Sequence, residues 1–258
     1  MYSSRPRNLW IQCRKPNPAA SARLICLPYA GGNASIYQNW PRLLTEEIEV
    51  LAVQLPGRGS RLLESRYTDV SQLIPAILQE IAPYADKPIL LFGHSMGALL
   101  SLELAHQLEE LQPGVLQHVF VSAYRAVHLP SRRNQSRHLL PDHEFKELLR
   151  RLNGTPEELL DNQELMDMIL PIMRADMQLC DTYLYQDRGP LPCGITVFGG
   201  RMDQEVSEAQ LVAWKDHTNK DFKLHMLPGD HFFIHSQEEA LIGLVRQETL
   251  KLIDKNSR

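Results

Sequence analysis

Three side chains in this sequence could together carry out nucleophilic chemistry: Ser95, Asp203 and His231. A serine hydroxyl is a weak nucleophile near neutral pH, so it needs a base that takes its proton. An imidazole can be that base when a carboxylate fixes its tautomer and stabilises the imidazolium that forms. Each of the three residues follows an apolar segment of the chain. The combination therefore predicts attack on a carbonyl carbon, and hence acyl transfer.

The serine lies in Gly93-His94-Ser95-Met96-Gly97, between a charge-free apolar run and a segment rich in alanine and leucine. These flanks predict a strand, a sharp turn and a helix, which is the arrangement of a nucleophile elbow. Glycines on both sides let the flanking chains pass closely. The first N–H groups of the helix would point at the serine, so the N–H of Met96 is a candidate oxyanion donor. A purely structural glycine turn is the alternative.

A second oxyanion donor is expected after the apolar segment Arg23-Leu24-Ile25-Cys26-Leu27-Pro28. The loop that follows, 29–35, is rich in small residues, and in this arrangement such a loop supplies the second N–H. The candidate donor is the N–H of Ala30. The pair Gly31-Gly32 alone is equally typical of a plain turn.

Rival residues exist for both the base and the acid. Of the ten histidines, His235 is the closest rival of His231, but it falls at the entrance to the last predicted helix and not in the loop before it. Asp230 and Glu205 are the rivals of Asp203. Neighbouring residues of an extended loop point apart, which disfavours Asp230 as the partner of the adjacent histidine.

The chain that must position these residues alternates between apolar strands and amphipathic helices. This alternation predicts an α/β fold with a mostly parallel sheet covered by helices on both faces. A short edge strand is expected near 9–11, and a C-terminal helix is expected to begin at Ser236 with Glu239 in a capping box. The main predicted strands are 23–28, 49–55, 89–92, 116–122, 194–200 and 222–227.

Residues 128–190 interrupt this alternation, because they are charged and helix-prone and contain no strand-like run. An insertion between two strands would lie above the carboxyl edge of the sheet, so we interpret it as a helical lid. Its apolar stripe is predicted from Leu165, Met168, Ile169, Ile172 and Met173. The stripe could cover an acyl chain, or it could simply pack helix against helix.

Composition excludes several classes of protein. A formal net charge of −4 with no long basic run argues against nucleic-acid and anionic-membrane partners. No uncharged stretch is long enough to span a bilayer, and residues 1–20 lack the apolar core of a signal peptide, so a cytoplasmic protein is expected. The four cysteines are scattered, which suggests reduced thiols and neither a zinc site nor a disulfide scaffold.

Taken together, the motifs resemble those of type II thioesterases, the stand-alone editing hydrolases that accompany nonribosomal peptide synthetases and polyketide synthases. The resemblance covers nearly the whole chain. Two departures are Gln204, where many relatives have proline, and a leader of about twenty residues. The matching segments are Leu27-Pro28-Tyr29-Ala30-Gly31-Gly32, Gln54 to Arg61, Gly93 to Ala98, Gly199 to Asp203, and Gly229-Asp230-His231-Phe232-Phe233.

The resemblance implies one α/β-hydrolase domain over 1–258, with a core of about 20–127 and 191–258 and a lid of about 128–190. The implied substrate is an acyl thioester on the phosphopantetheine arm of a carrier protein. No metal or redox cofactor is needed for this reaction, and a monomer is expected. An acyl-CoA thioesterase or a carboxylesterase would use the same residues, whereas a catalytically inactive binding module would usually lack one of them.

In this resemblance the catalytic residues are Ser95, Asp203 and His231, in the order expected of α/β-hydrolases. The N–H groups of Ala30 and Met96 would hold the oxyanion.

Overall fold

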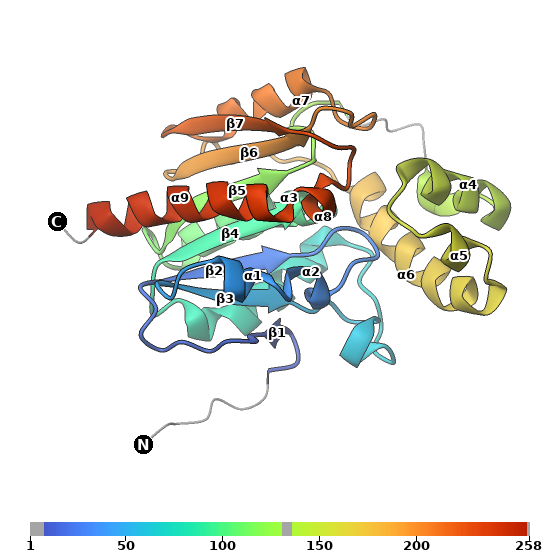
Figure 1. The fold of residues 1–258 in the computed structure, drawn as a ribbon, viewed down its shortest axis with the longest axis horizontal. Helices are drawn as coiled ribbons and strands as arrows, with labels where there is room; N and C mark the ends of the chain where they lie inside the picture. The colour runs from blue at the N-terminus through green and yellow to red at the C-terminus, as the bar shows by residue number, and fades with distance from the viewer. Residues whose placement is uncertain (1–7, 131–135, 257–258) are drawn as a thin grey trace.

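A seven-stranded sheet forms the centre of the computed structural model, which describes residues 8–130 and 136–256. The strand order is β1-β3-β2-β4-β5-β6-β7, and every pairing is parallel except that of β1 with β3 (Figure 1). The predicted α/β class is thereby confirmed. The strands are β1 Ile11–Gln12, β2 Ala22–Leu27, β3 Ile48–Val53, β4 Ile89–His94, β5 Leu116–Ser122, β6 Gly194–Gly200 and β7 Phe222–Leu227.

Helices cover both faces of the sheet. In Figure 1, α1 and α9 lie on the face toward the viewer, and α3 lies behind the sheet. The helices are α1 Trp40–Leu43, α2 Val70–Ile81, α3 Met96–Leu111, α4 Asp142–Leu152, α5 Glu157–Leu160, α6 Gln163–Thr182, α7 Glu208–Val212, α8 Phe233–Ser236 and α9 Glu238–Asn256.

Strand residues alternate between the two faces because successive side chains of a strand point in opposite directions. In β2, for example, Leu24 and Cys26 pack in a cluster with Trp40 and helix α9, whereas Ile25 and Leu27 pack in the cluster that includes helices α2 and α3. A strand that is buried on both faces has few polar positions, which explains the nearly continuous apolar runs in the sequence. The buried Arg23 of β2 and Glu49 of β3 are exceptions, and they pair with each other.

The carboxyl ends of the parallel strands are level with one another. Leu27 of β2 is opposite Gly93 of β4, and His94 is opposite Ser122 of β5. On the other side, Gly200 of β6 is opposite Leu227 of β7. Loops that leave these five strands therefore meet at a single edge of the sheet.

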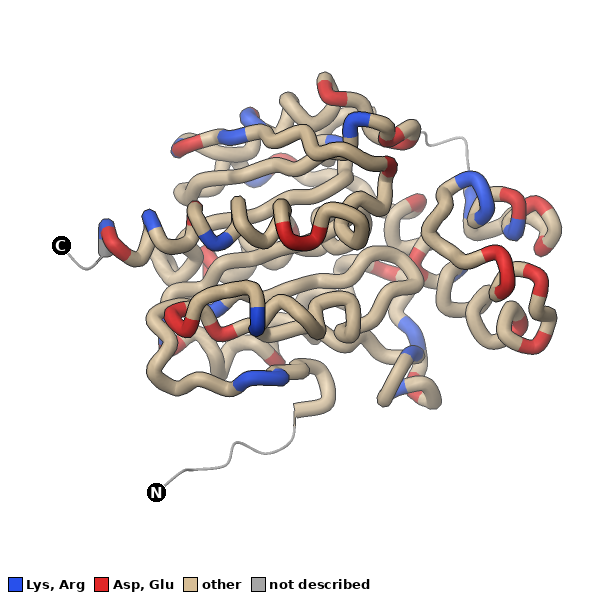
Figure 2. Tube along the Cα trace, viewed as in Figure 1, with Lys and Arg blue, Asp and Glu red and all other residues tan. Residues whose placement is uncertain are grey.

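Helices α4, α5 and α6 form a helical insertion between β5 and β6, and they lie beyond the carboxyl edge of the sheet (Figure 1). The insertion has a small core of its own, which consists of Phe145, Leu148, Leu149, Leu160, Met166, Leu170, Met173 and Met177. Most of its acidic residues lie on the outside, as Figure 2 shows, and the buried Asp176 of α6 is an exception. The polar outer face and apolar inner face are those of amphipathic helices that pack on a core.

Several local predictions need correction. Leu165 and Met168 of the predicted stripe are 42% and 52% exposed, because the buried face of α6 runs through Met166, Leu170 and Met173 instead. The C-terminal helix does not begin at Ser236, which is the last residue of the short helix α8; helix α9 begins at Glu238. The edge strand is confirmed but lies at Ile11–Gln12.

Within the described ranges, no helix combines the length and the apolar character that crossing a membrane requires. The same ranges contain no group of three or more histidine, cysteine, aspartate or glutamate side chains that could hold a metal ion.

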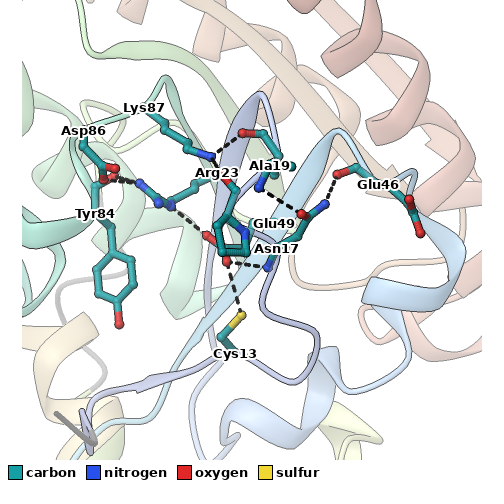
Figure 3. A network of polar contacts seen from close by, with 11 residues as sticks. Cys13, Asn17, Ala19, Arg23, Glu46, Glu49, Tyr84, Asp86 and Lys87 are labelled. Carbon is teal, nitrogen blue, oxygen red and sulfur yellow. Dashed lines mark hydrogen bonds and ion pairs between the residues drawn. The ribbon is translucent and has the colours of Figure 1, made fainter. Parts of the chain in front are cut away.

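A buried ion pair lies at the opposite, amino end of the sheet (Figure 3). Arg23 of β2 donates from Nε to Oε2 of Glu49 on the neighbouring strand β3 at 2.7 Å, and both side chains are less than a tenth exposed. Arg23 also contacts the carboxylate of Asp86 and the carbonyl oxygen of Tyr84. Oε1 of Glu49 accepts the N–H of Asn17, so the pair ties the segment before β2 to the sheet.

We predict that Glu49→Leu lowers the free energy of unfolding by about 3 kcal/mol, because it deprives a buried guanidinium of the buried one of its two carboxylate partners. Glu46→Gln is the matched control, since Glu46 pairs with Lys15 and both side chains are more than half exposed. The control should change stability by less than about 0.5 kcal/mol. Urea denaturation of both variants tests this prediction, and equal effects would contradict it.

Candidate active site

Ser95 lies between β4 and α3 in a strained backbone conformation, with φ of 51° and ψ of −119°. A positive φ is unusual for a residue with a side chain, and such strain persists only where the surroundings hold it. Here the N–H of Ser95 donates to the carbonyl oxygen of Ser122 on β5 at 2.7 Å. The turn thus presents the hydroxyl at the carboxyl edge of the sheet.

The glycines on either side of Ser95 are required by close contacts. A Cβ on Gly93 would lie 2.0 Å from the carbonyl oxygen of Gly97, and a Cβ on Gly97 would lie 2.3 Å from the carbonyl oxygen of Leu27. The second contact brings the start of α3 against the end of β2. The elbow and the loop after β2 are therefore neighbours.

The loops after β6 and β7 are joined by backbone hydrogen bonds. The N–H of Arg201 donates to the carbonyl oxygen of Leu227 at 2.8 Å, and the N–H of Met202 donates to that of Gly229 at 2.9 Å. A Cβ on Gly200 would lie 2.3 Å from the carbonyl oxygen of Asp230, so only glycine permits this approach. The joined loops carry Asp203 and His231.

The structure brings Ser95, His231 and Asp203 into one hydrogen-bonded line. Nε2 of His231 lies 3.0 Å from Oγ of Ser95, and Nδ1 lies 2.9 Å from Oδ2 of Asp203. A carboxylate accepts hydrogen bonds, so Nδ1 carries the proton and Nε2 is left to accept from the serine hydroxyl. This is the tautomer that a general base requires.

The second oxygen of Asp203 is held by the backbone. Oδ1 accepts the N–H groups of Glu205 and Val206 at 2.8 and 3.2 Å, and the side chain is 1% exposed. The carboxylate is therefore fixed in position while its other oxygen faces the imidazole.

The rival residues make other contacts. Asp230 accepts from the side chain of Asn153 at 2.8 Å and from the N–H of Phe232 at 2.8 Å. His235 is exposed, and its Nε2 lies 2.9 Å from the hydroxyl of Tyr29. Glu205 contributes its backbone N–H to Asp203 and lines a cavity beside Ser95.

The two candidate oxyanion donors flank the serine. Met96 is the first residue of α3, and N–H groups in the first turn of a helix have no carbonyl partner within that helix. Ala30 follows β2 and lines the same cavities as Ser95 and His231. The N–H groups of these two residues could receive negative charge that develops beside Ser95 Oγ.

His94 contacts the residues that hold Ser95 and His231 in place. Its ring is fully buried, with Nε2 2.9 Å from the carbonyl oxygen of His231 and Nδ1 2.8 Å from the hydroxyl of Ser122. Burial, followed by the nearby His231, keeps the pKa of His94 well below its usual value. The neutral ring therefore donates from Nε2 to the carbonyl oxygen of His231 and accepts at Nδ1 from the hydroxyl of Ser122.

Two cavities open from Ser95 and His231, of about 140 and 190 Å³, and both also contact Ala30 and Met177. The larger is mostly apolar and runs beneath the helical insertion, where it is lined by Leu149, Leu159, Ile169, Ile172, Met173 and Phe232. The smaller is lined by polar and apolar groups together, and its charged and amide side chains are Arg125, Arg137, Arg151, Asp181, Glu205 and Gln210. The site can thus receive an apolar group in the larger cavity and offers charged side chains in the smaller one.

Sequence reasoning missed two sets of supporting residues. The contact of His94 with the backbone of His231 is one of them, and only the fold reveals it. Sequence reasoning also missed that Arg58 pairs with Asp176 beside the loop that holds Ala30. A visible signal was the acidic residue at 176, which interrupts the apolar face of α6 between Ala175 and Met177.

Comparison with known proteins gives the family. A model of the thioesterase domain matches residues 22–249, which is most of the chain. The chain belongs to the thioesterase family. The solved structure of the type II thioesterase BorB from the borrelidin biosynthetic cluster is 35% identical with a TM-score of 0.84, and the match covers 92% of this chain and 96% of BorB. The predicted family and its α/β-hydrolase fold are thereby confirmed.

Two curated bacterial relatives match over nearly their full length. The gramicidin S biosynthesis protein GrsT of Aneurinibacillus migulanus is 42% identical over 95% of each chain. LgrE of Brevibacillus parabrevis, named a linear gramicidin dehydrogenase, is 43% identical over 92% of this chain and 90% of its own. The present sequence contains no Gly-x-Gly-x-x-Gly dinucleotide fingerprint, so it gives no support to a dehydrogenase reaction.

We predict that Asp203→Asn lowers kcat for thioester hydrolysis by about 10⁴-fold. The two backbone N–H groups would keep the amide oxygen at the Oδ1 position, so the NH₂ group would face Nδ1 of His231. That nitrogen would have to accept, and Nε2 would carry the proton and could not take another from Ser95. Steady-state kinetics of the folded variant measures the effect.

Asp230→Asn is the control, because Asp230 adjoins His231 in sequence without contacting its ring nitrogens. It should keep kcat within about threefold of the wild-type value, as expected of a group that does not act on the base. A larger loss from Asp230→Asn than from Asp203→Asn would reverse the assignment.

Proposed function

We propose that this protein hydrolyses acyl thioesters carried on the phosphopantetheine arms of carrier proteins in nonribosomal peptide or polyketide biosynthesis. The observation that carries the proposal is the hydrogen-bonded line Ser95–His231–Asp203, which lies where an apolar cavity meets a second cavity with charged side chains in its wall. The similarity to GrsT and BorB over nearly the whole chain supports the biosynthetic setting.

In the first half of the reaction, Oγ of Ser95 attacks the thioester carbonyl while Nε2 of His231 takes the hydroxyl proton. The N–H groups of Ala30 and Met96 hold the oxyanion of the tetrahedral intermediate. The C–S bond then breaks, and the imidazolium returns its proton to the thiolate that leaves. The acyl group is now an ester of Ser95.

In the second half, His231 takes a proton from water, which attacks the acyl-enzyme carbonyl. Collapse of this intermediate returns the proton to Oγ of Ser95 and releases a free acid. Asp203 stays ionised throughout and stabilises the imidazolium in each half. The products are a carboxylic acid and a carrier whose thiol is available again, so the reaction needs no metal or redox cofactor.

The two cavities suggest how the substrate lies. The apolar cavity beneath the helical insertion suits an acyl chain, because burial of apolar surface favours binding. The insertion, which the sequence predicts to span about 128–190, would then act as a lid over the core formed by about 20–127 and 191–258. Residues 131–135 of that span lie outside the described ranges.

The biological role that follows is editing: removal of wrong or stalled acyl groups from the assembly line, with product release as a related use. We place the protein in the cytoplasm, where such synthetases work, and expect a monomer that meets carrier domains transiently.

We predict that Ser95→Ala reduces thioester hydrolysis by at least about 10⁴-fold, because no other group supplies the nucleophile. Within the described part of the chain, the hydroxyl of Ser95 hydrogen-bonds only to His231, so the circular dichroism spectrum should be unchanged. A serine-directed phosphonate should label the wild-type protein at Ser95. Full activity of the variant together with an unlabelled wild-type protein would contradict the mechanism.

The substrate class is tested by giving the protein one acyl group on three leaving groups: a carrier-protein phosphopantetheine, coenzyme A and a simple alcohol. The proposal expects the highest kcat/KM for the carrier-bound thioester. Preference for the coenzyme A thioester would indicate an acyl-CoA thioesterase, and preference for the ester would indicate a carboxylesterase. Mass spectrometry of the released acids from a panel of carrier-bound acyl groups then defines the selectivity.

A further inference from the structure

The mechanism above makes no use of a carboxylate that is buried in the helical insertion. Asp176 lies on α6 with a side chain that is 0% exposed. Burying a charge is costly unless it is paired and hydrogen-bonded, so each of its contacts must contribute to holding it there. These contacts reach outside the insertion, to two loops at the carboxyl edge of the sheet.

The first contact is a two-pronged ion pair with Arg58, which follows β3 and is 4% exposed. Nη2 of Arg58 donates to Oδ1 of Asp176 at 2.7 Å, and Nη1 donates to Oδ2. Nη1 also lies 3.3 Å from the carbonyl oxygen of Gly32. Arginine–carboxylate pairs of this kind fix both position and orientation, so the carboxylate plane is held by a group outside its own helix.

The second contact is with the loop after β2. Oδ2 of Asp176 accepts the N–H of Gly31 at 2.7 Å. Gly31 is the third residue of a tight turn that the N–H of Gly32 closes onto the carbonyl oxygen of Tyr29 at 2.9 Å, and its φ is +77°. A positive φ at the third residue is typical of a type II turn, in which the central peptide is flipped relative to a type I turn. By accepting the central N–H, Asp176 stabilises that orientation.

The second residue of the same turn is Ala30, the candidate oxyanion donor. The turn also rests directly on α6, since a Cβ on Gly31 would lie 2.0 Å from Sδ of Met173. Both contacts from α6 therefore act on the peptide that follows Ala30. The position of the N–H of Ala30 therefore depends on helix α6 of the insertion as well as on the sheet.

We propose that Asp176, held by Arg58, is a positioning residue that sets the turn carrying the N–H of Ala30. The oxyanion hole is then complete only while α6 is seated against this turn. This inference rests on the proposed function, in which that N–H stabilises the tetrahedral intermediate. It makes seating of the insertion a condition for the chemical step as well as a means of covering the acyl chain.

The test compares two double variants that remove the same charges. Arg58→Gln/Asp176→Asn leaves an amide oxygen that can accept the N–H of Gly31, whereas Arg58→Met/Asp176→Leu leaves no acceptor. Asp142→Asn is the control, because Asp142 forms an ion pair with Arg174 within the insertion and does not contact the turn. For each folded protein, kcat and KM are measured with a short acyl thioester.

A second readout is the binding of an alkyl boronic acid, which forms a tetrahedral adduct on the serine and places an oxygen in the oxyanion hole. If Asp176 had only a structural role, the variants would change thermal stability, and the affinity for the boronic acid would change no more than KM does. The boronic acid thus reports on the donor independently of turnover.

The proposal expects Arg58→Met/Asp176→Leu to lower kcat by about 50-fold, less than the loss of a complete oxyanion donor, with KM within about twofold. Its affinity for the boronic acid should fall by a similar factor. The amide pair and the control should stay within about fivefold of the wild type in both readouts. Should the Met/Leu pair fail to fold, Arg58→Gln/Asp176→Ala serves instead, because it also removes the acceptor and adds no volume.

Unchanged kcat and boronic acid affinity in the variant without an acceptor would overturn the inference. Equal losses in both double variants would overturn it too, since the amide pair retains the acceptor. A wild-type protein that hydrolyses no thioester would count against the proposed function instead, and boronic acid binding would still test the turn.

Discussion

The hydrogen bond between Nε2 of His231 and Oγ of Ser95, 3.0 Å long, is the interaction on which the rest of the site depends. It joins residues that are 136 positions apart in the sequence. The two side chains must be positioned accurately relative to each other, because a displacement of about 1 Å at such a contact can lower the rate by about 10²-fold. The level carboxyl ends of β4 and β7 bring the two loops to one edge of the sheet. Close contacts at Gly93 and Gly97 shape the turn that carries Ser95. The contact of Gly200 with the carbonyl oxygen of Asp230 fixes the loop that carries His231.

Supporting contacts hold each partner from the side away from the substrate. Ser122 is central to them: its carbonyl oxygen accepts the N–H of Ser95, and its hydroxyl contacts His94, whose other nitrogen holds the backbone of His231. Because burial keeps the pKa of His94 low, this ring stays neutral and its hydrogen bonds keep one direction over the working pH range. On the substrate side, Asp176 extends the same principle to the insertion, since it links α6 to the turn that contains Ala30. The proposed nucleophile, base and oxyanion donor are thus each held by a partner from another element.

Much of the site could be predicted from the sequence because it depends on local rules. Glycines around Ser95, and an aspartate and a histidine each just beyond a late strand, follow from the geometry of parallel sheets, and the structure places them at one edge. The supporting contacts could not be predicted, since the pairing of Arg58 with Asp176 spans 118 positions and depends on how the insertion packs. The apolar stripe of α6 was only partly right for a similar reason: Leu165 and Met168 fit the helical period, but the rotation of the helix about its axis is set by tertiary packing. The start of α9 was misplaced because the chain forms the separate short helix α8 first.

The central claim is that the acyl group passes through an ester of Ser95, and partitioning between water and methanol tests it most directly. The protein is given one acyl group on three thiols, a carrier-protein phosphopantetheine, coenzyme A and N-acetylcysteamine, at a fixed methanol concentration. If all three form the same acyl-enzyme, the ratio of free acid to methyl ester must be the same for each thiol, whatever the overall rates. A ratio that changes with the leaving thiol would mean that water attacks the thioester itself, and it would contradict the account.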